Sequence, residues 1–304
     1  MTTRPIVLRA TLAWQILPTS AHSRKAFLLP AEAFMTRAYD ASYDALCRPG
    51  AVDDFFQRYP TTGSDGLAAE MSRLAYCDYA TVLAPALARA SFSLIGQPFE
   101  RGGTEAFLAQ NGTDAMLVFR GSDDLQAWIT NLDARLDDWQ GTGRVHVGFR
   151  DALHKVWPEV VDRLGDWFGP LTVTGHSQGG ALAHLAASLL PESRLVTFGS
   201  PRVGDQDFAG TLHQGRRYVD DRDLVCRLPH PRLPWMDAYR HGGRLHFIDR
   251  AGRISEPEDP DDAERLELSQ AALLESLSHL RDGRLPRHLT DHAPINYVAA
   301  LAGA

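Results

Sequence analysis

The sequence predicts an α/β fold in which a mainly parallel sheet carries helices on both faces. Past residue 115, short apolar runs typical of strands alternate with longer runs at helical spacing. The clearest unit is LTVTGHSQGGALAHLAASLL, residues 171–190, where a β-branched strand enters a glycine-flanked turn and an alanine-rich helix leaves it. Sheets of this kind bind ligands at the carboxyl ends of their strands, so functional side chains are expected in the turns that follow strands.

Each element is predicted from its local pattern. Glycines and prolines separate segments with a helical period from short β-branched or aromatic runs. Helices are expected over residues 31–47, within 67–90 as a pair whose second member is opened or kinked by Pro85, and over 147–167, 178–190, 261–280 and 293–301. Strands are expected over residues 92–95, 105–109, 115–119, 171–174, 194–198, 217–219 and 245–248. The acidic segment 255–264 is expected to be a solvated loop, with a calcium site as the alternative.

Composition limits the domain organisation and the partners. The chain has 304 residues, of which 44% are hydrophobic, enough for one large domain over residues 66–304 with an N-terminal extension, residues 1–65, packed on its core. The net charge of −7 argues against a nucleic-acid partner. The three cysteines have neither a disulfide nor a metal spacing. Because the N-terminus lacks a convincing signal-peptide core and no segment reaches transmembrane length, a cytoplasmic location is expected; the oligomeric state is left open.

The turn after the strand at 171–174 fits the pattern G-x-S-x-G, as Gly175-His176-Ser177-Gln178-Gly179. Between a strand and a helix, this pattern is typical of a nucleophile elbow, which holds a serine at a strained bend. Gly175 and Gly179 let strand and helix approach where a Cβ would clash, and the helix N-terminus favours developing negative charge. A structural turn that happens to carry a serine is the alternative.

A nucleophilic serine needs two partners further along the chain. Its hydroxyl reacts poorly until a base removes the proton, and that base needs an orienting carboxylate. In hydrolases with this elbow, the carboxylate comes next in the sequence and the histidine last. The segments RRYVDDRDLVCRLPHP and RHLTDHAPINY offer these candidates in that order: Asp220, Asp221, Asp223, His288 and His292.

Six blocks of sequence together make the chain resemble a class 3 lipase of the α/β-hydrolase superfamily. They are VFRGSDDLQAWITNLD, VHVGFRDAL, VTGHSQGGALA, VTFGSPRVGD, RDLVCRLP and DHAPINYVAAL, in the family's order from about residue 115 to residue 301. Residues 1–65 carry no such resemblance. The resemblance implies the α/β-hydrolase fold.

Carried over position by position, the resemblance also implies roles for single residues. Ser177 is the nucleophile, and Asp223, in RDLVCRLP, is the acid in preference to the two aspartates before it. The terminal DHAPINY block implies His292 as the base, with His288 as the fallback.

The oxyanion hole and two departures from the family pattern follow from the same resemblance. Ser122 is implied as one oxyanion donor, through its backbone N–H and its hydroxyl, and the backbone N–H of Gln178 as the other. Relatives usually have leucine at position 178, and many have proline where Cys226 stands. Since the hole needs only the backbone of Gln178, activity is expected to survive the first departure.

The segment after Ser122 has apolar residues at helical spacing: Leu125, Trp128, Ile129, Leu132, Leu136 and Trp139. In related lipases this segment covers the active site and opens at a lipid surface, which implies a lid that contains Leu125, Trp128 and Ile129. The alternative is an amphipathic helix packed on the core, and it is favoured beyond Leu132.

The resemblance implies a serine carboxylic-ester hydrolase that cleaves acylglycerols or related lipid esters through an acyl-enzyme, with no cofactor and no metal. A lipid–water interface is the expected setting. A phospholipase A1-type acyl hydrolase is the main alternative, and hydrolysis of polyesters or hydroxycinnamoyl esters is a weaker one. A non-catalytic binding protein of the same fold is the alternative from another class. A metal-dependent hydrolase, suggested by the closeness of His241 and His246, lacks an H-E-x-x-H or comparable ligand set.

Overall fold

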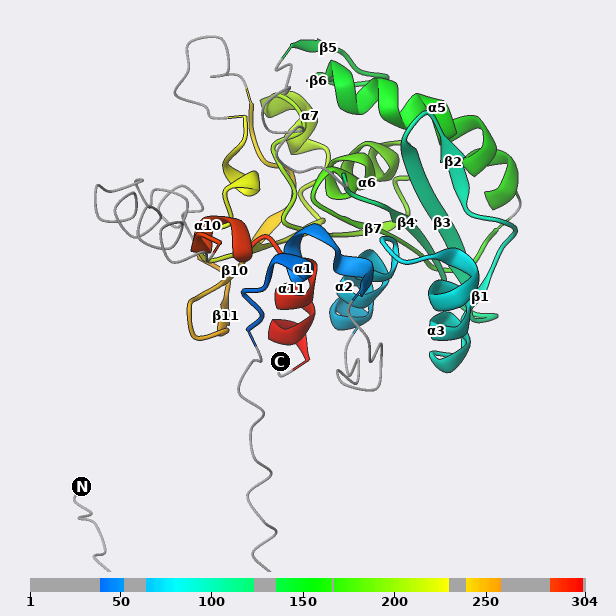
Figure 1. Cartoon of the computed structure of the whole chain (residues 1–304). Helices are drawn as coiled ribbons and strands as arrows, with labels where there is room; N and C mark the ends of the chain where they lie inside the picture. The colour runs from blue at the N-terminus through cyan, green and yellow to red at the C-terminus, as the bar shows by residue number, and fades with distance from the viewer. Residues whose placement is uncertain are drawn as a thin grey trace, which may run out of the picture. The chain divides into compact units, whose positions relative to one another are not determined.

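The computed structural model describes residues 39–51, 64–122, 135–165, 167–229, 239–257 and 285–302, all of them within one compact unit, Met35–Ala304 (Figure 1). The predicted helix at 261–280 and most of the predicted acidic loop at 255–264 lie outside these residues. None of the helices in the described ranges is long and apolar enough to span a membrane.

Within the described ranges, one sheet has nine strands: β1 (Ser93–Leu94), β2 (Phe99–Arg101), β3 (Thr104–Gln110), β4 (Ala115–Phe119), β7 (Leu171–His176), β8 (Arg194–Phe198), β9 (Arg216–Asp220), β10 (Arg244–Ile248) and β11 (Ile254–Ser255). Their order is β1-β3-β4-β7-β8-β9-β10-β11, and β2 pairs with β3 off this path. The inner strands from β4 to β10 run parallel, whereas β1, β2, β3 and β11 pair antiparallel at the edges. The predicted parallel sheet is therefore confirmed for the centre of a mixed sheet.

Helices cover both faces of this sheet, as predicted. On one face lie α5 (Val147–Leu164) and α6 (Gln178–Leu189), and on the other lie α2 (Ser64–Leu74), α3 (Ala84–Arg89) and α11 (Pro294–Leu301) (Figure 1). Strand β4 contributes apolar side chains to the cores on both faces of the sheet. Leu117 and Phe119 belong to the core under α5 and α6, while Met116 and Val118 belong to the core under α2 and α11, because successive side chains of a strand point to opposite faces.

Several short elements were not predicted. Besides β2 and β11 they are the paired strands β5 (Leu136–Asp138) and β6 (Arg144–His146), helices α7 (Gln206–Gly210) and α10 (Arg287–Thr290), and single turns at Pro49–Ala51, Tyr79–Leu83 and Val225–Arg227. Such elements hold too few residues for a periodic pattern to emerge. The predicted break within 67–90 is confirmed, since Pro85 lies in the first turn of α3.

The helical pattern proposed to run through Leu136 and Trp139 is wrong at that end. Leu136 lies in β5, which pairs antiparallel with β6, so cross-strand pairing overrides the helical spacing there. Trp139 is buried in the core beside α6 and its indole N–H donates to Ser188 Oγ (2.9 Å). The proposed lid residues Leu125, Trp128 and Ile129 lie outside the described residues.

The helix predicted over residues 31–47 is also shorter than expected. Within the described residues only α1 (Tyr43–Cys47) is helical, because Ser42 is its N-cap and accepts a hydrogen bond from the backbone N–H of Ala45 (3.1 Å). The side chain of Ala45 is fully buried and shares a core with α2 and α11. The described part of the N-terminal extension thus packs on the main body.

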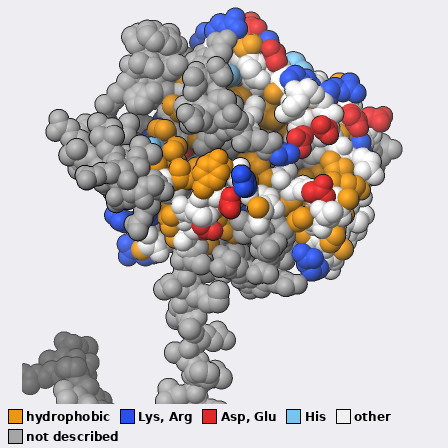
Figure 2. Space-filling view, viewed as in Figure 1, with side chains coloured by type: hydrophobic (Ala, Val, Ile, Leu, Met, Phe, Trp, Pro, Cys, Tyr) orange, Lys and Arg blue, Asp and Glu red, His pale blue; other side chains and the backbone are white. Residues whose placement is uncertain are grey.

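Neither the charged side chains of the surface nor the three cysteines indicate a second site in the described residues. On the face shown in Figure 2, the described acidic and basic side chains are interspersed with each other and with apolar groups. Cys47, Cys77 and Cys226 form no disulfide, and burial raises the pKa of Cys77 to about 12. A buried thiol of this kind is unreactive at neutral pH.

Candidate active site

Ser177 stands between the end of β7 and the first residue of α6. Its φ of 59° and ψ of −131° lie in a region that only glycine adopts without strain. The backbone N–H of Ser177 donates to the carbonyl oxygen of Phe198 at the end of β8 (2.9 Å), which fixes the bend over the edge of the sheet. The chain therefore forms the strained strand-to-helix turn that a nucleophile elbow requires.

Two glycines make this bend sterically feasible. A Cβ on Gly175 would collide with the backbone of Gly179, and a Cβ on Gly179 would collide with the carbonyl of Phe119 and lie 2.8 Å from Arg120 C. The neighbouring atoms are backbone, so they cannot move aside as a flexible side chain can. The predicted steric need for glycine at both positions is confirmed, and at 179 the close neighbour is the end of β4.

Asp223 and His292 come together from segments almost seventy residues apart. His292 Nδ1 lies 2.8 Å and 3.0 Å from the two carboxylate oxygens of Asp223, and both side chains are buried. The Tyr297 hydroxyl donates to the same carboxylate (2.6 Å). Burial pushes the pKa of Asp223 up, but His292 and these hydrogen bonds outweigh it, so the pKa lies below its ordinary value. The carboxylate is thus charged and fixes the Nδ1–H tautomer of His292.

The other ring nitrogen of His292 points at no partner. Nε2 is buried and makes no hydrogen bond among the described residues, including none to the Ser177 hydroxyl. Hydrogen bonds between a nucleophile and its base are often loose before substrate binds. The imidazole nevertheless lies at the elbow, because its ring centroid is 4.5 Å from that of His176, the residue before Ser177.

His176 ties the elbow to the loop that carries His292. We call residues 291–293, between α10 (Arg287–Thr290) and α11, the histidine loop. Because a carbonyl oxygen only accepts, His176 Nε2 donates to the backbone carbonyl of His292 (2.7 Å), and His176 Nδ1 accepts from the Tyr76 hydroxyl (2.8 Å). Burial, assisted by the nearby His292, lowers the pKa of His176 to about 3. His176 is therefore a neutral, doubly bonded support.

The proposed oxyanion residues, Ser122 and Gln178, both adjoin the elbow. Ser122 follows Gly121, where a Cβ would lie 3.1 Å from Ser177 Cβ and 2.8 Å from the carbonyl oxygen of His176. The same Cβ would collide with the Tyr76 hydroxyl, so the chain before Ser122 passes directly over the elbow. Gln178, whose backbone N–H is the second proposed donor, is the first residue of α6. A cavity of about 540 Å³ opens next to Tyr76 and Arg120.

The remaining candidate residues make contacts other than those of the triad. Asp221 faces Arg287 (Oδ2 to Nε, 3.8 Å), and the backbone N–H of Asp220 donates to the Tyr297 hydroxyl (3.1 Å). His288 is half-buried in α10, and burial lowers its pKa. His241 Nε2 bonds the carbonyl of Cys226 (2.8 Å), and no group of three or more His, Cys, Asp or Glu side chains that could hold a metal occurs in the described ranges.

Comparison with known proteins identifies the family of this architecture. Residues 116–233, which include the elbow and Asp223, match the family described as Lipase (class 3). This region of the chain is of the class 3 lipase family. A curated "Lipase" of Rhizomucor miehei is 34% identical over 168 residues, 48% of this chain and 45% of that protein. Phospholipase A1-Igamma1, chloroplastic, of Arabidopsis thaliana is 29% identical over 231 residues, 56% of this chain and 43% of that protein.

A solved structure supports the same assignment. The structure of a triacylglycerol lipase whose catalytic centre is a serine protease triad superposes with a TM-score of 0.56 at 27% identity, covering 71% of this chain and 91% of that one. The superposition shows that this chain has the α/β-hydrolase fold. The chain spans about half the length of the curated relatives it matches.

Some contacts of this site had no signal in the sequence. Tyr76 lies two residues after the end of α2 and a hundred residues before its partner His176. No local pattern distinguishes it from other core tyrosines. His176 was recognised only as part of the elbow, and its bond to the carbonyl of His292 depends on the folded chain. Long-range hydrogen bonds of this kind leave no periodicity to detect.

Proposed function

We propose that the protein is a serine carboxylic-ester hydrolase that cleaves acylglycerols or related lipid esters. One observation carries the proposal: a serine at a strained elbow lies beside a buried histidine whose Nδ1 is held by a charged aspartate and whose Nε2 is unpaired. This is the set of groups that nucleophilic acyl transfer needs. The match to the class 3 lipases over residues 116–233 supports the substrate class.

The reaction follows from the roles of these groups. His292 Nε2 takes the Ser177 proton as Oγ bonds to the ester carbonyl carbon, and the oxyanion that forms accepts hydrogen bonds from Ser122 and the backbone N–H of Gln178. Collapse of this intermediate breaks the ester C–O bond, and His292 protonates the departing alcohol. Water then repeats the sequence on the acyl-enzyme to release the acid, while Asp223 holds the imidazole tautomer throughout.

Ser177→Ala tests the proposal directly. The variant should fold normally, lose measurable ester hydrolysis and no longer be labelled by a fluorophosphonate probe, because no other hydroxyl occupies the elbow. Ser193→Ala, which removes a hydroxyl bonded to Leu190 O at the far end of α6, is the matched control. Hydrolysis retained by Ser177→Ala would refute the assignment, and a wild-type chain that is neither labelled nor active would favour a non-catalytic binding protein.

Phospholipase A1-type hydrolysis is the second candidate, favoured by the similarity to the phospholipase A1 of Arabidopsis thaliana. Both reactions use the same acyl transfer and differ in the leaving alcohol. Product analysis on triacylglycerol, on phosphatidylcholine and on short p-nitrophenyl esters separates them. Faster release of fatty acid from the sn-1 position of phosphatidylcholine than from triacylglycerol would replace the first assignment by the second.

We further propose that the protein works at a lipid–water interface. Support comes from the apolar spacing of Leu125, Trp128 and Ile129 directly after Ser122 and from the family's substrates. Activity measured against substrate concentration should rise sharply as the ester passes its solubility limit. Smooth saturation across that limit would contradict the interfacial proposal while leaving the chemistry intact.

A further inference from the structure

The histidine loop is short and is held by its neighbours. Only three residues separate α10 from α11, so the position of His292 depends on what fixes the residues around it. On the inner side, the imidazole is held by Asp223 and the backbone carbonyl by His176. The outer side is held by a segment from the opposite end of the chain, residues 39–40, which lies outside the region matched to the family.

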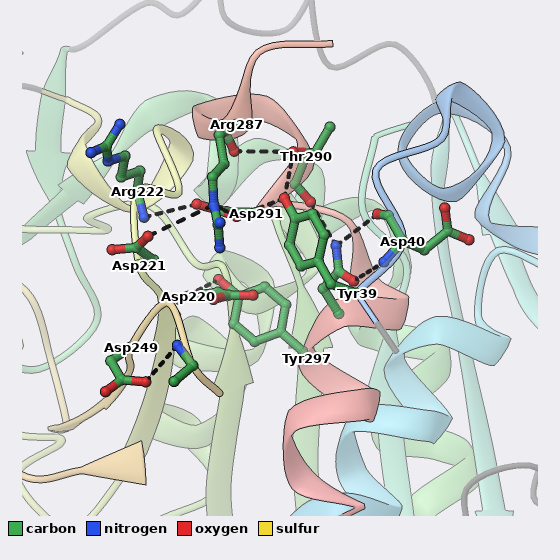
Figure 3. A network of polar contacts seen from close by, with 12 residues as sticks. Tyr39, Asp40, Asp220, Asp221, Arg222, Asp249, Arg287, Thr290, Asp291 and Tyr297 are labelled. Atoms are coloured by element: carbon green, nitrogen blue, oxygen red, sulfur yellow. Dashed lines mark hydrogen bonds and ion pairs between the residues drawn. The ribbon is translucent and has the colours of Figure 1, made fainter. Parts of the chain in front are cut away.

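Tyr39 makes the first attachment. Its hydroxyl donates to Asp291 Oδ1 (2.7 Å) and lies 2.5 Å from Thr290 Oγ1, so it contacts both residues that precede His292 (Figure 3). The guanidinium of Arg287 lies 4.8 Å from the centre of the Tyr39 ring and also reaches Asp291 Oδ1 (3.2 Å). The tyrosine is thereby fixed in orientation as well as in position.

Asp40 makes the second attachment through its backbone. Its N–H donates to Asn296 Oδ1 (2.8 Å), and Asn296 Nδ2 donates back to the Asp40 carbonyl (3.0 Å). The same Nδ2 also donates to the carbonyl of Thr290 (2.9 Å). Asn296 is fully buried, which shields its side chain from water and strengthens these bonds. The segment is therefore joined to the chain on both sides of His292.

The Tyr39 bond matters because Asp291 is fully buried. The Asp291 carboxylate has three donors: the Tyr39 hydroxyl, the Arg287 guanidinium and the backbone N–H of Arg222 (3.1 Å) (Figure 3). Burial raises the pKa of Asp291, despite these donors. A buried carboxylate that loses a donor must find another or move toward solvent, and movement of Asp291 displaces the adjacent His292.

We propose that residues 39–40 form an N-terminal latch that positions His292 for its reaction with Ser177. The inference rests on the proposed hydrolase function. Tyr39 and Asp40 act only through the histidine loop and are positioning residues. Activity of this protein thus depends on a segment that precedes the family-matched region by more than seventy residues.

Tyr39→Phe in the full chain tests the latch, because it removes the hydroxyl and keeps the ring over Arg287. Well below the melting temperatures of both proteins, kcat and the rate of Ser177 labelling by a fluorophosphonate should each fall about tenfold, with KM for a short soluble ester unchanged. Tyr43→Phe, the same change on an exposed tyrosine of α1, should leave both rates at the wild-type value.

A double-mutant cycle with Asp291→Asn adds a second readout. If Tyr39 acts through Asp291, the double variant should be as active as the less active of the two single variants, with no additional loss. A folded Tyr39→Phe protein with wild-type kcat and labelling rate, even with a lowered melting temperature, would overturn the latch. Should Tyr39→Phe not fold, Asp291→Asn, which weakens the same hydrogen bond from the side of the histidine loop, must lower both rates with KM unchanged. A wild-type chain that neither hydrolyses esters nor is labelled would instead refute the hydrolase function.

Discussion

The serine elbow and the histidine loop meet at the carboxyl ends of the central strands. The conformations of these two segments are determined in opposite ways. The elbow is one continuous stretch, and its conformation follows from Gly175 and Gly179 packing against backbone. The histidine loop takes its position from His176, Asp223 and the N-terminal latch, which lie between about seventy and two hundred and fifty residues away in the sequence. One half of the site is therefore encoded locally and the other half by tertiary contacts.

This difference predicts how each half responds to substitution. A change in the elbow should act sterically, on folding and on the approach of α6 to β4. A change around the histidine loop should act on catalysis with a smaller effect on stability, because each contact there supports an orientation. Measuring both quantities for each variant shows whether the two halves separate in this way.

The largest effect is expected at Asp223. Asp223→Asn keeps the shape but allows the wrong tautomer of His292, so kcat should fall by about 10⁴-fold. Steady-state kinetics on a soluble ester, with circular dichroism to confirm folding, measure it. Asp221→Asn is the matched control, because its carboxylate faces Arg287 and its φ of 31° suits asparagine; it should change kcat by less than about twofold. Equal losses in both variants would contradict the assignment of Asp223.

The next largest effect is expected from Gly179→Ala, a change in the locally encoded half. The new Cβ must displace the backbone of Phe119 and Arg120, so the free energy of unfolding should fall by about 2–4 kcal/mol. Gly210→Ala, in α7 with nothing within 4 Å of the added Cβ, should be neutral or slightly stabilising. Denaturant titration measures both, and a neutral Gly179→Ala would show that the elbow can relax.

The same contrast explains what could be predicted from the sequence. The central strands and the elbow were predicted because their apolar periods and glycine positions are local signals. Strands β2 and β11 were missed because two or three residues carry no period, and Leu136 was misassigned because pairing with β6 overrides helical spacing. Asp223 and His292 were singled out only through family resemblance, since the sequence alone left three aspartates and two histidines open. Tyr39, Tyr76 and Asn296 had no local signal at all.

A smaller effect is expected on the pH dependence of stability. With a pKa of about 3 in the folded protein, His176 stays neutral there, whereas in the unfolded chain it takes up a proton below about pH 6.5. Its contribution to stability is therefore complete above pH 6.5 and is lost as the pH falls, by about 2 kcal/mol at pH 5. His184 and His241, whose pKa values burial also lowers, add to the slope with the same sign.

His176→Gln isolates the share of His176, because an amide can still donate to the carbonyl of His292 but does not titrate. Between pH 6.5 and 5, the variant should lose less stability than the wild type, by about 1.7 kcal/mol, because part of the ~2 kcal/mol is already lost at pH 6.5. His213→Gln, on the exposed surface, is the control. Urea titrations at both pH values measure the slopes, and identical slopes would show that His176 does not stay neutral in the folded state.

The smallest effect is expected from Tyr297→Phe, which removes one of the hydrogen bonds that hold Asp223. His292 still bonds the carboxylate, so kcat should fall about tenfold, the equivalent of about 1.4 kcal/mol and far less than for Asp223→Asn. Tyr218→Phe is the matched control, since that hydroxyl also donates to a buried carboxylate, Asp65 Oδ2 (2.5 Å), which pairs with Arg194 and Arg216 at the starts of β8 and β9. Tyr218→Phe should lower stability and leave kcat unchanged. If both variants lose stability alone, Tyr297 supports the fold and the orientation of Asp223 is fixed by His292 and the backbone.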